Sequence, residues 1–267
     1  MKKSVLITGA ADGLGKATAL AFADRGWHVI ATDKDREGLE SLSSREEMEC
    51  LFMDVTSDES VGEAFRTIRD RVECLDLVIN NAGMDRYFPF SEEPASGFQS
   101  LFELNLFGAC RVNQTFLPLV RKPGGRIIHI GSESHHLRIP FMPYPLTKRA
   151  LEGYSKVLRQ ELRFSGIDVV EVRPGAIRTR LLANVSEIRY PVACPGLREA
   201  FGVFSRTAAK EVGKVMDPGQ VARFIVKVSE IPHPKAVYRI NNSLKLRIAE
   251  RIPFRLQEKL ISWKLRK

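Results

Sequence analysis

Short apolar runs alternate with amphipathic stretches along most of this chain. Runs that are apolar on both sides and bounded by Gly, Asn, Asp or Pro are typical of parallel strands buried on both faces of a sheet. The pattern predicts about seven such strands, at residues 4–8, 28–32, 50–53, 75–80, 125–130, 167–172 and, more weakly, 237–240.

The stretches between these runs carry apolar residues at helical spacing, as Val61, Ala64 and Ile68 do. Helices are expected over residues 16–25, 36–44, 57–72, 98–121 and 144–163. Strands that alternate with helices predict an α/β fold of the Rossmann type, a doubly wound parallel sheet with helices on both faces. No repeat, low-complexity tract or linker interrupts the pattern, so residues 1–267 are predicted to form one domain.

A glycine-rich loop follows the first predicted strand and leads into the first helix. It carries Gly9, Gly13 and Gly15, with Asp12 and Leu14 between them. Glycines at such a turn let the backbone approach a pyrophosphate closely, and the helix N-terminus stabilises its charge. A plain glycine-rich turn is the alternative, but the strand–loop–helix context favours a dinucleotide site.

Asp33 lies 18 residues after Gly15, at the end of the second predicted strand. A carboxylate there can accept hydrogen bonds from an adenosine ribose and would repel a 2′-phosphate, which favours NAD over NADP. A helix N-cap role for Asp33 is compatible with this interpretation. Lys34 and Arg36 lie nearby and weaken the preference, so NADP remains an alternative.

Tyr144 and Lys148 are four residues apart in a predicted helix and therefore share one helix face. An ammonium beside a phenol favours the phenolate and lowers a phenol pKa that starts near ~10. Tyr144 is thus a candidate general acid/base. Such pairs also arise by chance in many helices, so this one gains weight only from the rest of the chain.

The ordered motifs together resemble the short-chain dehydrogenase/reductase family of the classical type, over residues 4–230. They are Thr8-Gly9-x3-Gly13-x-Gly15, Asp54-Val55, Asn80-Asn81-Ala82-Gly83, Asn105, Ser132, Tyr144-x3-Lys148 and Pro174-Gly175. The resemblance implies hydride transfer between a nicotinamide and a carbinol carbon, with Tyr144 moving the hydroxyl proton.

By the same resemblance, Lys148 would lower the pKa of Tyr144 and hold the nicotinamide ribose, and Ser132 would bind the substrate oxygen. Asn105 would help to order a water that relays protons. The remaining cofactor contacts implied are Asp54, Val55, Asn81, Ala82, Gly83, Pro174, Gly175, Ile177 and Thr179.

Three local features depart from the family pattern or complicate it. Ser132 lies twelve residues before Tyr144 instead of the usual thirteen. We interpret this as a one-residue deletion in the loop 133–143, with Ser134 a poorer substitute. Prolines flank Tyr144, and the second is acceptable in a first helical turn. His135 and His136 are predicted to be exposed loop residues at the pocket entrance, with no metal site.

Residues 180–217 match the variable segment that covers the substrate in this family. Its apolar side chains favour a lid over a hydrophobic alcohol or ketone; packing of a structural helix is an equal alternative. These side chains are Leu181, Leu182, Tyr190, Val192, Phe201, Val203 and Phe204.

The net charge of +9 is concentrated at the C-terminus, because residues 244–267 hold eight Lys or Arg and two Glu. Apolar residues alternate with these charges, and Pro253 predicts two short helices. Such a tail could lie in a membrane interface, or cover the substrate cleft or a partner subunit. Similar tails occur in the retinol and 17β-hydroxysteroid dehydrogenase-like branch. Nucleic acid is disfavoured, since no stacking platform accompanies the charge.

The chain begins without an apolar run long enough for a signal peptide or a spanning helix, and its four cysteines are scattered. We therefore expect a cytoplasmic protein, with the inner membrane surface as an alternative location. The resemblance implies a homodimer or homotetramer. The favoured hypothesis is an NAD(H)-dependent oxidoreductase for a small lipophilic secondary alcohol or ketone. Its competitors are a non-catalytic dinucleotide sensor and a peripheral membrane protein on the same fold.

Overall fold

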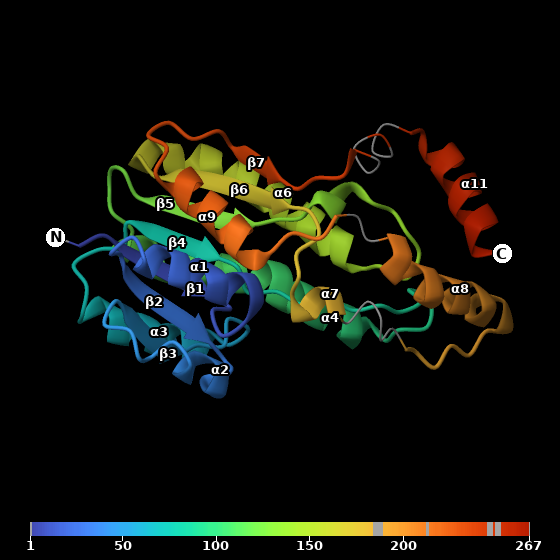
Figure 1. Ribbon diagram of the computed structural model, residues 1–267, viewed down its shortest axis with the longest axis horizontal. Coiled ribbons are helices and arrows are strands. Elements are labelled where there is room, and N and C mark those ends of the chain that lie inside the picture. The colour runs from blue at the N-terminus through green and yellow to red at the C-terminus, as the bar shows by residue number, and fades with distance from the viewer. Residues whose placement is uncertain (1, 184–188, 212–213, 245–247, 249–251, 267) are drawn as a thin grey trace.

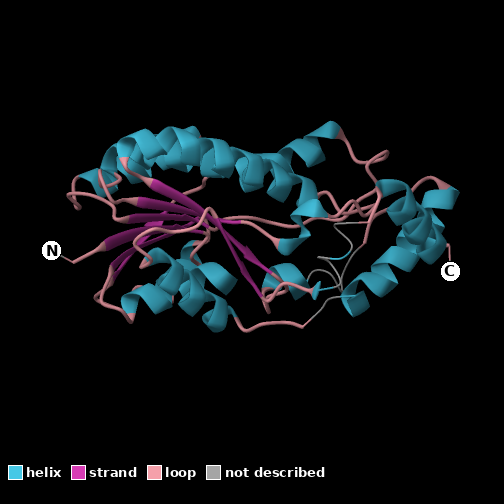
Figure 2. Cartoon of the chain, turned by 90° about the horizontal axis from the view of Figure 1, so that it is seen from above, coloured by secondary structure: helices cyan, strands magenta, loops and turns pink. Residues whose placement is uncertain are grey.

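Seven parallel strands form one sheet in the order β3-β2-β1-β4-β5-β6-β7. The computed structural model describes residues 2–183, 189–211, 214–244, 248 and 252–266. The strands are β1 (Ser4–Thr8), β2 (His28–Asp33), β3 (Met48–Phe52), β4 (Leu77–Asn80), β5 (Arg126–Ile130), β6 (Asp168–Pro174) and β7 (Val237–Ile240). Helices cover both faces of this sheet (Figures 1 and 2), which confirms the predicted fold class.

The strand order reverses at β1, which pairs with β2 on one side and with β4 on the other. Open α/β sheets bind ligands in the crevice beyond the carboxyl ends of the strands at such a point. The loops that follow β1 and β4 therefore flank the expected binding crevice.

The described helices of the α type connect and cover these strands. They are α1 (Gly13–Ala23), α2 (Arg36–Glu40), α3 (Asp58–Arg69), α4 (Ala95–Phe102), α5 (Gly108–Phe116), α6 (Tyr144–Leu162), α7 (Arg180–Ala183), α8 (Pro195–Glu211), α9 (Pro218–Ser229) and α11 (Phe254–Leu265). Short 3-10 helices lie at Leu117–Leu119, Glu133–His136 and Arg163–Ser165, and a π-helix lies at Glu103–Phe107.

The alternation of side chains along the strands divides the core into two layers. Val5 and Ile7 of β1 point to the face covered by α1 and α9, whereas Leu6 points to the face covered by α3 and α5. All three side chains are fully buried. A strand with apolar residues on both faces is stable only between two helical layers, so the apolar runs follow from this packing.

The long helix predicted over residues 98–121 is wrong in one respect, because the structure divides it into α4, the π-helix, α5 and a 3-10 turn. The π-helix surrounds Asn105, whose side chain bonds outside the helix. Pro118 lies in the 3-10 turn and has no N–H to continue an α-helical ladder. The third strand also begins earlier than predicted, at Met48.

The tail is broken at Pro253 as predicted, since α11 begins at the next residue. The helix predicted before it falls largely on residues 245–247 and 249–251, which lie outside the described residues. Helix α11 lies beside α8, away from the sheet (Figure 1). Within the described ranges, every helix is too short or too polar to span a bilayer.

Candidate active site

A cavity of about 660 Å³ opens over the carboxyl ends of the strands. Every predicted site residue except Asn105 lies in its wall. These wall residues are Gly9, Asp12, Gly13, Leu14, Gly15, Asp33, Lys34, Asp54, Val55, Asn81, Ala82, Gly83, Ser132, Tyr144, Lys148, Pro174, Gly175, Ile177 and Thr179.

The glycine loop is held so tightly that two of its positions have no room for a side chain. Gly9 has a φ of +67°, in the left-handed region that favours glycine. A Cβ on Gly15 would lie 1.8 Å from the carbonyl oxygen of Gly9. The loop therefore turns sharply and brings the N-terminus of α1 to the cavity.

Asn81 links this loop to the end of β4. Its amide nitrogen Nδ2 donates to the carbonyls of Thr8 and Gly9 at 2.9 and 3.0 Å. In return, the Thr8 hydroxyl accepts hydrogen bonds from the backbone N–H groups of Asn81 and Ala82 at 3.0 and 3.1 Å. These four bonds fix the two loops that flank the crevice.

Asp33 lies at the end of β2 with its carboxylate turned toward the glycine loop. It accepts hydrogen bonds from the backbone N–H groups of Ala11 and Asp35, both at 3.0 Å. Each carboxylate oxygen keeps a further lone pair. The guanidinium of Arg36, which could have favoured a phosphate, lies over the ring of Phe52 at 4.2 Å from its centroid.

Tyr144 is the first residue of α6, and Lys148 lies one turn later. The Lys148 ammonium is buried and donates to the carbonyl of Ile130 at 2.8 Å. Its Nζ lies 5.5 Å from the centroid of the Tyr144 ring. Burial lowers the pKa of Lys148 to about 8, while the charge of Glu171 acts in the opposite direction.

The pKa of Tyr144 is raised above its ordinary value, so the lowering expected from Lys148 does not prevail in this structure. Burial is the main cause, because a phenolate loses solvation in the cavity wall. The negative charge of Asp85 adds to the rise, and a hydrogen bond with Ser132 opposes it. The phenol is therefore protonated at neutral pH in this structure.

Asn105 is buried below the cavity instead of lining it. Its Oδ1 accepts from the backbone N–H of Met84 at 2.8 Å, and its Nδ2 donates to the Met84 carbonyl at 2.9 Å. The same Nδ2 donates to the Thr147 hydroxyl at 3.0 Å. The structure thus gives Asn105 a positioning role between the loop after β4 and helix α6.

Ser132 precedes the 3-10 helix Glu133–His136. The Ser132 hydroxyl caps this helix by accepting from the backbone N–H of Ser134 at 3.1 Å. The two serine hydroxyls lie 2.9 Å apart, and both residues line the cavity. Ser134 therefore holds the side chain of Ser132 in place at the cavity wall.

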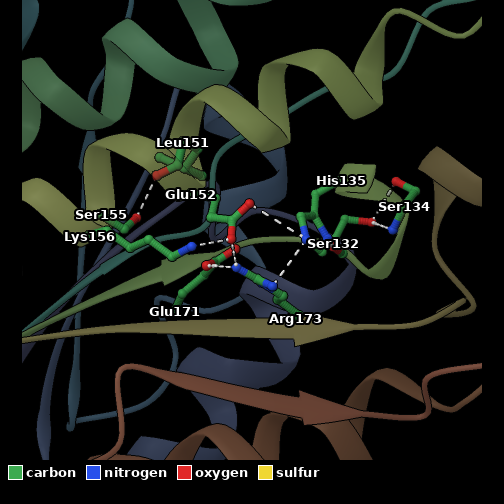
Figure 3. A network of polar contacts seen from close by, with 9 residues as sticks. All are labelled: Ser132, Ser134, His135, Leu151, Glu152, Ser155, Lys156, Glu171 and Arg173. Atoms are coloured by element: carbon green, nitrogen blue, oxygen red, sulfur yellow. Dashed lines mark hydrogen bonds and ion pairs between the residues drawn. The ribbon is translucent and has the colours of Figure 1, made fainter. Parts of the chain in front are cut away.

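A buried charge network lies behind this loop (Figure 3). The guanidinium of Arg173 bonds to carboxylates of Glu171 and Glu152, both at 2.7 Å. His135 lies next in the network, with its Nε2 3.1 Å from Arg173 and its Nδ1 3.0 Å from the carbonyl of Ser132. A carbonyl and a guanidinium fix the tautomer, because Nδ1 must donate and Nε2 must accept. The network thereby reaches the backbone of Ser132.

The prediction that the two histidines are exposed at the pocket entrance is wrong. His135 is buried, and burial followed by the charge of Arg173 lowers its pKa. His136 is half-buried. No local feature of the sequence indicates this burial, because Arg173 lies 38 residues away from His135.

The part of the cavity wall that the segment 180–217 and α11 form, called the apolar half below, carries several apolar side chains beside Arg180, Thr207 and Lys264. The segment 180–217 contributes Leu182 and Phe204 to this half, and α11 contributes Ile261 and Leu265. The tail therefore covers part of the cavity, one of the arrangements that its sequence left open.

Two polar residues also line this cavity, of which Asp85 was not singled out from the sequence. Asp85 and Tyr87 lie in the loop after β4 and line the cavity. The sequence signal that could have identified Asp85 is the presence of a carboxylate shortly after the Asn81-Ala82-Gly83 turn.

Comparisons with known proteins give one consistent answer. The family profile described as short chain dehydrogenase matches residues 3–189. The Escherichia coli (strain K12) protein named uncharacterized oxidoreductase YbbO is 36% identical over 206 residues, which cover 75% of this chain and 76% of that protein. Estradiol 17-beta-dehydrogenase 2 of Rattus norvegicus is 35% identical over 194 residues, 68% of this chain but only 50% of the rat protein. A solved short-chain dehydrogenase from Streptomyces avermitilis superposes with a TM-score of 0.81 at 27% identity, covering 99% of this chain and 96% of that one.

Substitution of Gly15 by Ala tests the tight turn. The new Cβ would lie 1.8 Å from the Gly9 carbonyl oxygen, so the loop and α1 must separate. We expect a loss of about 1–3 kcal/mol in the free energy of unfolding and weaker NADH binding, measured by thermal unfolding and by NADH fluorescence. Gly153→Ala is the matched control, because nothing lies within 4 Å of its new Cβ. Wild-type NADH affinity in Gly15→Ala would contradict the assignment of the loop.

Substitution of Arg173 by Met tests the buried network. Burial raises the pKa of Glu152, but hydrogen bonds from Lys156 and Arg173 lower it from 4.5 to about 2. The stability that ionised Glu152 contributes to the folded protein is therefore complete above pH 4.5 and is lost as the pH falls toward 2. We expect Arg173→Met to lose about 3–5 kcal/mol of stability at neutral pH and to show a flatter pH dependence across that acidic range, measured by urea unfolding.

The control for this test is Arg69→Met, which breaks an exposed ion pair with Asp70. Exposed pairs contribute about 1 kcal/mol or less. Equal losses in the two variants would show that the network behind Ser132 is not a buried, mutually dependent unit.

Proposed function

The chain belongs to the short-chain dehydrogenase family, and we propose that it transfers hydride between NAD(H) and a lipophilic secondary alcohol or its ketone. Membership of this family makes it an oxidoreductase with a Rossmann NAD(P)-binding fold. The proposal adds the cofactor preference, the substrate class and the roles of individual residues. It rests on one observation: Tyr144, Ser132 and Lys148 share a cavity with the glycine loop.

The residues of the crevice suit a dinucleotide. Asp12 is the N-cap residue of α1, and its side chain accepts no hydrogen bond from the first helical turn. The N–H groups at the start of this helix are therefore available to a pyrophosphate. Asp33 would hold the adenosine ribose and Lys148 the nicotinamide ribose. When bound, NAD(H) supplies or accepts the hydride at C4 of its nicotinamide.

Tyr144 would move the proton of the reacting hydroxyl group. Because burial keeps the phenol protonated at neutral pH, it is ready to donate to a carbonyl oxygen in the direction of reduction. In the reverse direction the phenolate would accept the alcohol proton, with the positive charge of Lys148 favouring that form. Ser132, held by its cap to Ser134, would orient the substrate oxygen.

The apolar half of the cavity supports a lipophilic substrate. Leu182, Phe204, Ile261 and Leu265 present hydrocarbon to the space in front of Tyr144, and such walls bind apolar ligands. The similarity to estradiol 17-beta-dehydrogenase 2, whose name denotes a steroid alcohol, points the same way. The tail would act with the segment 180–217 as a cover over this half.

Asp33 supports a preference for NAD. Its carboxylate is fixed by two backbone N–H groups at the rim of the cavity, where its charge would repel a 2′-phosphate. Arg36 is occupied by its contact with Phe52, although Lys34 lines the same wall.

Tyr144→Phe is expected to reduce turnover by at least about a hundredfold, because it removes the transferable proton and keeps the ring. NADH binding, which depends on the glycine loop, should survive. A panel of lipophilic alcohols and ketones, followed by NADH absorbance, measures the first effect, and NADH fluorescence measures the second. Undiminished turnover would refute the role of Tyr144. Tight NADH binding by the wild type without turnover of any substrate would favour a non-catalytic sensor.

Asp33→Asn is expected to shift cofactor preference toward NADP. The amide keeps an acceptor for Ala11 and nearly the same shape, but it removes the charge that repels a phosphate. We expect the ratio of kcat/KM for NAD to that for NADP to fall by about tenfold or more, as for the loss of about 1.4 kcal/mol of discrimination. An unchanged ratio would mean that Asp33 does not discriminate between NAD and the 2′-phosphate of NADP.

A further inference from the structure

Asp85 and Tyr87 place a fixed polar pair beside the apolar half of the cavity. Both residues line the cavity wall. Both also interact electrostatically with Tyr144, which puts them close to the reacting centre. The role proposed for Tyr144 uses neither of them, so their presence requires a separate explanation.

Asp85 and Tyr87 have free acceptor lone pairs but no hydrogen left to donate to a ligand. The Tyr87 hydroxyl lies 2.6 Å from Oδ2 of Asp85 and donates its only hydrogen there. An ionised carboxylate has no hydrogen of its own. The remaining oxygen of Asp85, Oδ1, is buried and has no hydrogen-bond partner. Asp85 and Tyr87 can therefore accept further hydrogen bonds but cannot donate any.

Leaving these acceptor lone pairs without a hydrogen-bond donor costs free energy, because the surroundings are apolar. The Tyr87 ring packs against Phe204, with 5.9 Å between centroids, and belongs to an apolar cluster with Phe141 and Phe201. The neighbouring cation Arg86 pairs with Glu93 instead of Asp85, and Arg180 of the cavity wall pairs with Asp12. Burial raises the pKa of Asp85 to about 6, while the hydrogen bond from Tyr87 and the nearby backbone N–H of Arg86 act in the opposite direction. The carboxylate is thus mostly ionised at neutral pH, and a buried charge without a cation is costly.

We propose that Asp85 and Tyr87 select a substrate that carries a second hydrogen-bond donor, a hydroxyl or an ammonium group, in addition to the reacting hydroxyl. This inference rests on the proposed function, because Tyr144 fixes where the carbinol lies. A donor on the substrate satisfies the pair, whereas an ether or carbonyl oxygen would face its lone pairs. The preferred substrate is therefore an apolar molecule with a polar group at each of two positions.

Binding to the NADH complex tests this without requiring turnover. The probes are secondary alkanols of several chain lengths, each made with a terminal hydroxyl, ammonium, methyl or methyl ether group. Their dissociation constants are measured from the change in NADH fluorescence above pH 7. At the best chain length, the hydroxyl or ammonium member should bind at least about tenfold more tightly than the methyl member. The methyl ether should gain nothing.

Two variants identify the residue and the kind of donor. Asp85→Leu removes charge and acceptor, and should abolish the preference for either donor. Asp85→Asn keeps an acceptor oxygen without the charge, so it should abolish a preference for ammonium but only reduce one for hydroxyl. Asp70→Asn is the control, because it makes the same charge change at an exposed carboxylate. It should leave the preference intact.

Equal binding of all four terminal groups to the wild type would overturn the inference, as would a donor preference that persists in Asp85→Leu. If Asp85→Leu fails to bind NADH, Asp85→Asn carries the test alone. Failure of the proposed function has a different signature, namely no turnover of any probe by the wild type. The binding preference can be measured in either case.

Discussion

The active site depends on the close joining of two loops at the point where the strand order reverses. Gly9 and Gly15 bring the chain back on itself after β1, and Asn81 bonds to the carbonyls of Thr8 and Gly9 across the crevice. These contacts turn the N-terminus of α1 toward the cavity, where its N–H groups have no side-chain cap from Asp12. The uncapped start of α1 is thereby suited to an anion at this edge of the sheet.

The catalytic side of the cavity is supported from behind by charge. Arg173 is held between Glu171 and Glu152, and it donates to His135, which in turn contacts the carbonyl of Ser132. A buried ion network is sensitive to the loss of any member. It is therefore suited to fixing the loop that carries Ser132.

Much of this arrangement could be predicted because it is encoded locally. Apolar runs predict strands wherever both faces are covered, and the glycine spacing before α1 predicts a phosphate turn from backbone sterics alone. Tyr144 and Lys148 could be paired because helical geometry relates them. The rest depends on tertiary contacts. The raised pKa of Tyr144 results from burial and from Asp85, and the burial of His135 results from Arg173 on another strand. The π-helix at Asn105 likewise follows from its bonds to Met84.

Hydride transfer itself can be followed most directly with NADH that carries deuterium at C4 of the nicotinamide. The protein is incubated with this cofactor and a panel of lipophilic ketones, and each product alcohol is examined by mass spectrometry. Direct transfer predicts one deuterium at the carbinol carbon in ordinary water, and none there when unlabelled NADH is used in deuterated water. Product whose carbinol hydrogen comes from the solvent would contradict an active site in which Tyr144 moves only the proton and the cofactor carries the hydride.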